Sequence, residues 1–240
     1  MCTLSFLPRP SGYVVAMNRD ERLSRVEALP PRRFEFCGTT AIYPHEPGGG
    51  TWIAVNERRM TLALLNLGDS SGRKHRSRGE IIPALVSSGS SAEVGARLRG
   101  TDLAGVLPFR LIGIFGGERR ILEWRWDGWA LRRRSFAWRR QHWFSSGISD
   151  ERARRGRAPA FESAWRRRSA GALGWLRGMH RSHQPAPGPF SVCVHRPDAG
   201  TRSYTEIVCD AFFVRMRYQP GAPCNSQSRS AKIARLRSGR

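Results

Sequence analysis

The stretch that decides the fold reads CTLSFLPRPSGYVVAMNRDE over residues 2–21. Residues 3–7 read as a short β-strand, and residues 13–17 are apolar and rich in β-formers, which is typical of a second strand. The five residues between them include two prolines, a serine and a glycine, a composition that favours a turn. The stretch therefore predicts a β-hairpin, which folds the residues after the second strand back alongside the start of the first.

Cys2 is a candidate nucleophile because of its position. If Met1 is removed, as a small second residue usually permits, Cys2 carries a thiol and a free α-amine on one carbon. The amine has an ordinary pKa of about 7.7–8.0 and can act as the general base for the thiol. The pattern indicates covalent acyl-transfer chemistry. The alternative interpretation is a processed start codon followed by a buried strand cysteine.

A charged tetrapeptide, Asn18-Arg19-Asp20-Glu21, follows the second strand, so the hairpin brings it to Cys2. Arg19 can lower the pKa of the thiol and hold a substrate carboxylate or an oxyanion. Asp20 can hold the N-terminal ammonium group or orient the amine. The alternative is an ordinary charged turn after a strand.

Four sequence blocks together resemble the NRDE family, also called the transport and Golgi organisation protein 2 family. They lie in the family's order between residue 1 and about residue 210. The blocks are Met1-Cys2-Thr3 with Asn18-Arg19-Asp20-Glu21, Gly49 to Arg58 with Leu64-Leu65-Asn66, Ser77-Arg78-Gly79-Glu80, and Gly200-Thr201-Arg202-Ser203. The family's name implies a role in transport or membrane organisation.

The first two blocks also resemble the choloylglycine and penicillin V acylases, which are N-terminal nucleophile hydrolases. That resemblance implies an α+β fold of four αββα layers. It assigns Cys2 as nucleophile, with Arg19 and Asp20 beside it, and Asn66 as an oxyanion-hole donor.

Four further residues complete the expected site. Arg202 is the counterpart of a late catalytic arginine, or else a solvent-facing strand charge. Ser146 stands where the acylases carry an asparagine, so one polar contact is lost or replaced. With Ser146, Asn18 and Trp52 are the predicted substrate-binding residues.

The chain is strongly basic, with 41 Lys and Arg against 19 Asp and Glu and a net charge of +22. Lys74 and Lys232 are the only lysines, so the excess is almost entirely arginine. Such charge favours nonspecific adhesion to anionic polymers at low salt. The arginines are dispersed and no nucleic-acid-binding motif accompanies them, so no specific nucleic acid is expected as partner.

The cysteines are odd in number and contain no Cys-x-x-Cys pair, which argues against a disulfide framework or a zinc ribbon. They are Cys2, Cys37, Cys193, Cys209 and Cys224. A reducing, cytoplasmic location is the simplest expectation. Pro8 and Pro10 interrupt the apolar start, so no signal peptide is predicted, and no apolar run approaches membrane-spanning length.

No cofactor or metal is expected. The run Gly48-Gly49-Gly50 lacks the lysine of a P-loop. His180 and His183 have a spacing that can bind metal on a helix, but no third ligand accompanies them, so they are interpreted as surface histidines.

The pattern predicts one domain over 1–218 and a basic, disordered tail over 219–240. Further strands are expected at 34–36, 41–43, 51–56, 60–66, 109–115, 120–126, 129–136, 190–195, 202–209 and 212–217. The strands at 190–195 and 202–209 are expected to pair as a hairpin. Helices are expected at 78–88, 91–99 and 150–178, the last with Asp150 as N-cap.

The leading hypothesis is a cysteine-type N-terminal nucleophile amidohydrolase that cleaves a linear or small non-peptide amide. One alternative is a noncatalytic family member that carries a lipid or haem-like ligand in the same fold. A second alternative is an arginine-rich nucleic-acid binder. The pattern does not determine the oligomeric state.

Overall fold

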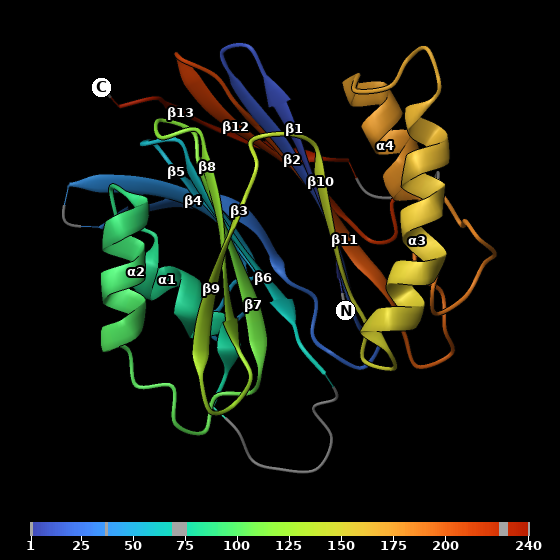
Figure 1. Ribbon diagram of the computed structural model, residues 1–240, viewed down its shortest axis with the longest axis horizontal. Helices are drawn as coiled ribbons and strands as arrows, with labels where there is room; N and C mark the ends of the chain where they lie inside the picture. The colour runs from blue at the N-terminus through green and yellow to red at the C-terminus, as the bar shows by residue number, and fades with distance from the viewer. Residues whose placement is uncertain (1, 37, 69–75, 226–229, 240) are drawn as a thin grey trace.

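The computed structural model describes residues 2–36, 38–68, 76–225 and 230–239. Neighbouring strands run antiparallel in two sheets (Figure 1). The six-stranded sheet has the order β10 (Gln141–Ser145), β1 (Cys2–Arg9), β2 (Gly12–Arg22), β11 (Ala199–Cys209), β12 (Phe213–Pro220), β13 (Lys232–Arg237). The seven-stranded sheet has the order β3 (Leu29–Phe36), β4 (Thr39–His45), β5 (Ile53–Asn56), β6 (Met60–Asn66), β7 (Phe109–Phe115), β8 (Arg120–Trp126), β9 (Leu131–Phe136).

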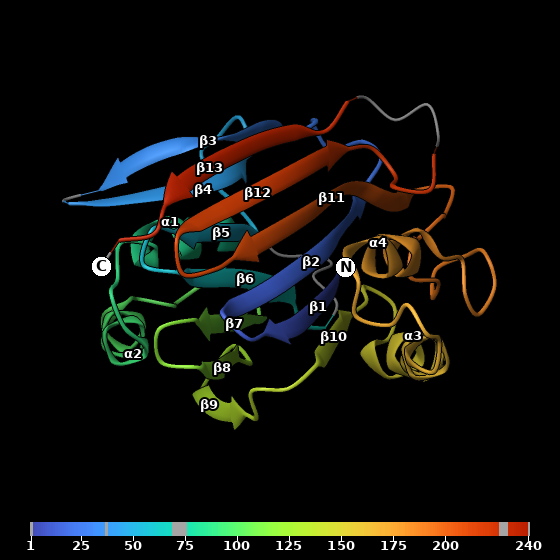
Figure 2. The same cartoon turned by 90° about the horizontal axis from the view of Figure 1, so that it is seen from above.

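Two pairs of helices cover the outer faces of the two sheets. Helices α1 (Ile81–Leu85) and α2 (Ser91–Gly100) pack on the seven-stranded sheet, and a 3-10 turn at Arg78–Glu80 precedes them. Helices α3 (Asp150–Trp165) and α4 (Leu173–Arg181) pack on the six-stranded sheet. Figures 1 and 2 show the helix pairs on opposite sides of the two sheets, which is the predicted four-layer αββα arrangement.

The hairpin of β1 and β2 is buried on both faces because its side chains alternate between two cores. Leu4 and Phe6 enter the core between the two sheets, whereas Leu7 faces the core under α3 and α4. This explains why residues 13–17 of β2 read as a continuous apolar run, whereas residues 2–6 of β1 alternate between apolar and small polar residues. The register places Cys2 opposite Arg19, as the hairpin predicted.

The predicted helix over 150–178 is in fact two helices. Gly171 has a φ of +88° in the connection, a conformation that glycine adopts without strain and that ends regular helix. The connection folds α4 back so that Trp175 lies 5.0 Å from Trp165, between ring centroids, and its indole N–H donates to the Ala164 carbonyl. The N-cap is Ser149, whose hydroxyl accepts from the Arg152 N–H, rather than Asp150.

Two predictions about the C-terminal third are wrong. Residues 190–195 were expected to form a hairpin with 202–209, but β11 lies between β2 and β12, because β2 offers it a long complementary edge. The segment 219–240 was expected to be disordered, yet it contains the end of β12 and all of β13. Leu236 of β13 is buried in the inter-sheet core, which explains the pairing.

Gly12 allows β2 to approach β11 closely. A Cβ at this position would lie 2.0 Å from the Cys209 carbonyl oxygen, which belongs to the backbone and cannot rotate away. We expect Gly12→Ala to destabilise the fold by at least about 1–3 kcal/mol, measured by urea unfolding.

Gly178→Ala is the matched control, because a Cβ there meets nothing within 4 Å on α4. It should stabilise the protein by about 0.5–1 kcal/mol, since alanine is the better helix former. Equal unfolding midpoints for Gly12→Ala and the unmodified protein would contradict this account of the hairpin.

Candidate active site

A pocket of about 310 Å³ opens where the ends of the two sheets face each other. The six-stranded sheet contributes Cys2, Arg19 and Asp20, and β6 of the other sheet contributes Asn66. Trp52, just before β5, also lines the pocket. The structure therefore brings five of the eight predicted site residues together.

Cys2 is held in place by strand pairing on both sides. It lies opposite Arg19 on β2 and opposite Ser145 on β10, and only 6% of its surface is exposed. Burial raises the pKa of the Cys2 thiol, and the Asp20 carboxylate acts in the same direction. The Asp20 backbone N–H and the Arg19 guanidinium lower that pKa and offset part of the rise. Met1 lies outside the described residues.

Arg19 is a buried, oriented cation on the pocket wall. Its guanidinium pairs with the Glu46 carboxylate at 2.5 Å and lies over the Trp52 ring at 4.3 Å from the centroid. Arg25 donates to both oxygens of the same Glu46 side chain, at 2.9 and 2.6 Å. Trp52 and Glu46 together fix the direction of the Arg19 side chain.

Asp20 lines the pocket and its carboxylate has polar partners on two other elements. Its Oδ1 accepts a hydrogen bond from the Thr201 hydroxyl at 2.6 Å, and its Oδ2 lies 3.8 Å from the Arg157 guanidinium. Burial raises the pKa of the Asp20 carboxyl, whereas the charge of Arg157 and the bond from Thr201 lower it. These contacts hold a carboxylate in a place where burial disfavours its charge.

Arg157 is a site residue that the sequence interpretation missed. It is completely buried, and it donates to the Thr3 hydroxyl at 3.0 Å and to the Cys2 carbonyl at 3.4 Å. A signal was present, because Arg157 falls on the helical stripe of Ala153 and Phe161 that faces the sheet. An arginine on a buried stripe indicates a buried anionic partner.

The pocket rim carries more cations than anions. Beyond Arg19, the lining includes Arg25, Arg76 and Arg78, against Asp20, Glu21 and Glu46. Arg78 donates to the Pro108 carbonyl, and burial lowers the pKa of its guanidinium. The pocket can therefore orient a ligand that carries an anionic group.

Three predicted site residues do not line this pocket. Asn18 donates from its amide nitrogen to the carbonyls of His180 and Val192, at 2.9 Å each. The Ser146 hydroxyl accepts the N–H groups of the two residues at 148 and 149 before α3. Arg202 extends toward Glu27, 4.0 Å away.

His180 is a core residue, not the surface histidine that was predicted. Its Nε2 lies 2.9 Å from the Ser5 hydroxyl, which lies 3.1 Å from His142 Nδ1, and its Nδ1 lies 3.0 Å from the Asn18 side chain. Burial lowers the pKa of both histidines to about 3, and the charge of His142 adds to the effect on His180. This hydrogen-bonded chain fastens α4 to β1 and β2.

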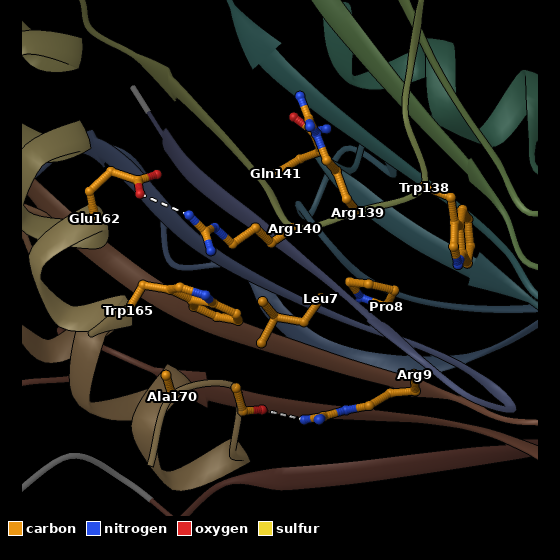
Figure 3. Close-up of a pocket in the computed structure, with 11 residues that line it drawn as sticks. Leu7, Pro8, Arg9, Trp138, Arg139, Arg140, Gln141, Glu162, Trp165 and Ala170 are labelled. Atoms are coloured by element: carbon orange, nitrogen blue, oxygen red, sulfur yellow. Dashed lines mark hydrogen bonds and ion pairs between the residues drawn. The ribbon is translucent and has the colours of Figure 1, made fainter. Parts of the chain in front are cut away.

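A larger cavity, of about 820 Å³, lies at the other end of β1 (Figure 3). An ion pair of 2.9 Å joins Arg140 to Glu162 there, and Arg140 also lies over the Trp165 ring. No cysteine, serine or histidine is among the described residues that line it. The smaller pocket is therefore the better candidate for chemistry, because it alone of these two contains a nucleophile.

The comparisons with known proteins agree with this architecture. The family model described as Transport and Golgi organisation 2 matches residues 1–120. No curated protein matches the chain significantly. In the described part of the chain, no helix is long and apolar enough to cross a membrane.

Solved structures share the fold at low sequence identity. Penicillin V acylase from Agrobacterium tumefaciens is 11% identical with a TM-score of 0.53, and the match covers 92% of this chain and 83% of that one. A cysteine-to-alanine mutant of conjugated bile acid hydrolase from Clostridium perfringens is 11% identical with a TM-score of 0.50, covering 98% and 96%. An arginine-to-leucine variant of the same hydrolase is 10% identical with a TM-score of 0.53, covering 100% and 97%.

The buried histidines make the stability depend on pH in a defined window. Their folded pKa of about 3 lies below the unfolded value of about 6.5. The unfolded chain therefore binds protons that the native state does not bind between these values. The contribution that the two neutral histidines make to the free energy of unfolding is fully present above about pH 6.5 and is lost as the pH falls toward 3. Each histidine contributes up to about 1.4 kcal/mol per pH unit in this window.

We expect His180→Gln to flatten the fall in unfolding free energy between pH 6.5 and 4, measured by urea titration at each pH. The same variant above pH 7.5 is the control, because both histidines are neutral there in both states. An unchanged slope in the acid range would contradict the burial of a neutral His180.

Proposed function

Because the chain belongs to the Transport and Golgi organisation 2 family and has the fold of N-terminal nucleophile hydrolases, we propose that it is a cysteine-type amidohydrolase acting on a small, non-peptide amide. One observation carries the proposal. The pairing register sets Cys2 opposite Arg19, and Asp20 and Asn66 line the same pocket.

In the proposed reaction the Cys2 sulfur attacks the amide carbonyl carbon, and the carbonyl electron pair moves onto the oxygen. The α-amine of Cys2, exposed after removal of Met1, accepts the thiol proton and transfers it to the leaving nitrogen as the C–N bond breaks. Water then hydrolyses the thioester and releases the acid. Asn66 and backbone N–H groups hold the oxyanion, while Arg19 and Asp20 keep the site in position.

The size and charge of the pocket support a small substrate with an acidic group. A volume of about 310 Å³ lies at the lower end of ligand pockets, which span about 300–1,000 Å³. Arg25 and Arg76 already pair with Glu46 and Asp102, so Arg78 is the lining guanidinium that we expect to bind a carboxylate. A short acyl group on an amino acid meets both conditions.

One observation favours the carrier alternative, in which the pocket holds a lipid or haem-like ligand without turnover. Burial raises the pKa of the Cys2 thiol, and a hydrolase needs the thiolate. In the hydrolase proposal, the α-amine of Cys2, exposed when Met1 has left, accepts the thiol proton as general base, and the charge of Arg19 lowers the thiol pKa. Whether Met1 is removed, so that Cys2 carries a free α-amine, is therefore the decisive measurement.

We also propose a cytoplasmic location. The described cysteines are all free, at positions 2, 193, 209 and 224, as a reducing compartment would keep them. Cys37 lies outside the described residues.

The test combines intact mass with amine release. We expect the purified protein to lack Met1 and to release amine from a panel of penicillin V, conjugated bile salts and short N-acyl amino acids. Cys2→Ala should lower the rate at least about 1,000-fold, because it removes the nucleophile. Asn66→Ala should lower kcat by about 100- to 1,000-fold, the usual effect of losing an oxyanion donor.

Cys209→Ala is the matched control, because Cys209 is a buried free thiol in the inter-sheet core and does not line the pocket. It should keep the activity. Retention of Met1, or equal amine release by Cys2→Ala and the unmodified protein, would reject the hydrolase. Tight ligand binding that survives Cys2→Ala without amine release would establish the carrier instead.

A further inference from the structure

Four potential metal ligands converge on one point outside the candidate active site. They are His183, Cys193, His195 and Cys224, and their ligand atoms all lie within 4.8 Å of one another. His183 follows α4, Cys193 and His195 precede β11, and Cys224 follows β12. The fold therefore brings Cys224 to a loop, between α4 and β11, that carries the other three residues.

Four interatomic distances within this cluster are close to those of a tetrahedral zinc centre. Zinc bonds of about 2.3 Å to sulfur and 2.0–2.1 Å to nitrogen place tetrahedral ligand atoms about 3.3–3.8 Å apart. The two sulfurs lie 3.5 Å apart and the two Nε2 atoms 3.2 Å apart. His195 Nε2 lies 3.7 Å from Cys193 Sγ and 3.2 Å from Cys224 Sγ.

We propose that His183, Cys193, His195 and Cys224 form a structural Cys2His2 zinc site. Two thiolates and two imidazoles are the donor set that suits zinc, and four protein ligands leave no open position for a substrate or water. Binding displaces the two thiol protons, so the metal neutralises two thiolates held close together.

A disulfide between Cys193 and Cys224 explains less of the geometry. Such a bond would use the two sulfurs and would give His183 and His195 no reason to direct their Nε2 atoms at the same point. Cys193 is buried, whereas both histidines are exposed, so the cluster lies at the surface where a metal ion can reach it.

Backbone hydrogen bonds already hold the ligand-bearing segments together. The Cys193 N–H donates to the Ser182 carbonyl at 2.9 Å, beside His183. The Ser191 hydroxyl donates to the Cys193 carbonyl at 2.5 Å, and the His195 N–H donates to the Gly188 carbonyl at 3.3 Å. These contacts hold the backbone of Cys193 and His195, and that of Ser182 next to His183, without relying on the metal.

The zinc site would support two other parts of the molecule. Between Cys193 and His195, the Val194 N–H donates to the Thr201 hydroxyl at 2.8 Å, and that hydroxyl donates to Asp20 at 2.6 Å. The loop therefore lies directly behind the candidate active site. Cys224 connects the end of β12 to the same centre, ahead of β13 in the chain.

The test is metal content of the full-length protein without an affinity tag, purified under reducing conditions. We expect one zinc per chain by elemental analysis. After chelation, Co²⁺ should restore a one-to-one complex with the absorption of tetrahedral cobalt and of cobalt–thiolate charge transfer. Cys193→Ser and Cys224→Ser should each weaken zinc binding more than about 100-fold, beyond the 10- to 100-fold typical of outer-shell changes.

Cys209→Ser is the control, since this free cysteine lies in the inter-sheet core and should leave zinc binding unchanged. Failure of the unmodified protein to bind zinc in competition with a chromogenic chelator would overturn the site. So would a Cys193–Cys224 disulfide in metal-free protein trapped with a thiol-blocking reagent at lysis. None of these readouts depends on hydrolase activity, so the experiment tests the zinc site independently of the proposed function.

Discussion

Cys2 and Arg19 face each other across the antiparallel ladder of β1 and β2, and the candidate site depends on that register. A slip of one residue would turn every side chain of β1 to the opposite face of the sheet. Leu4 and Phe6 would then leave the inter-sheet core, so burial of these apolar side chains holds the register. The energy that positions the thiol comes from the core, not from contacts in the pocket.

Buried polar groups connect this hairpin to the rest of the fold. Asp20 on β2 contacts Thr201 on β11 and lies near Arg157 on α3, so one carboxylate joins three elements. On the same side of the sheet, Asn18 binds His180 of α4. Buried polar groups are costly unless they are paired, and this cost makes the packing of α3 and α4 specific.

The sequence was most informative where structure is local. Turn residues between two apolar runs predicted the hairpin, and the family resemblance supplied the αββα layers and Asn66. The predictions from the sequence were wrong where contacts between distant segments determine which strands pair. The segment 190–195 has the composition of a strand, but β2 occupies the edge of β11 that it would need. The segment 219–240 was predicted to be disordered because it is basic, yet β13 pairs with β12 and buries Leu236 in the inter-sheet core.

The sequence alone determined that Cys2, Arg19 and Asp20 lie together, because the hairpin that unites them is short and its apolar alternation has one favourable register. Only the tertiary structure decided that Arg157 is buried beside Asp20, that Asn18 bonds to the His180 carbonyl and that Ser146 accepts the Ile148 N–H. It also decided that ligand atoms of His183, Cys193, His195 and Cys224 lie within 4.8 Å of one another. Contacts of this kind depend on how separate elements pack against one another, and the spacing of residues along the chain does not determine that packing.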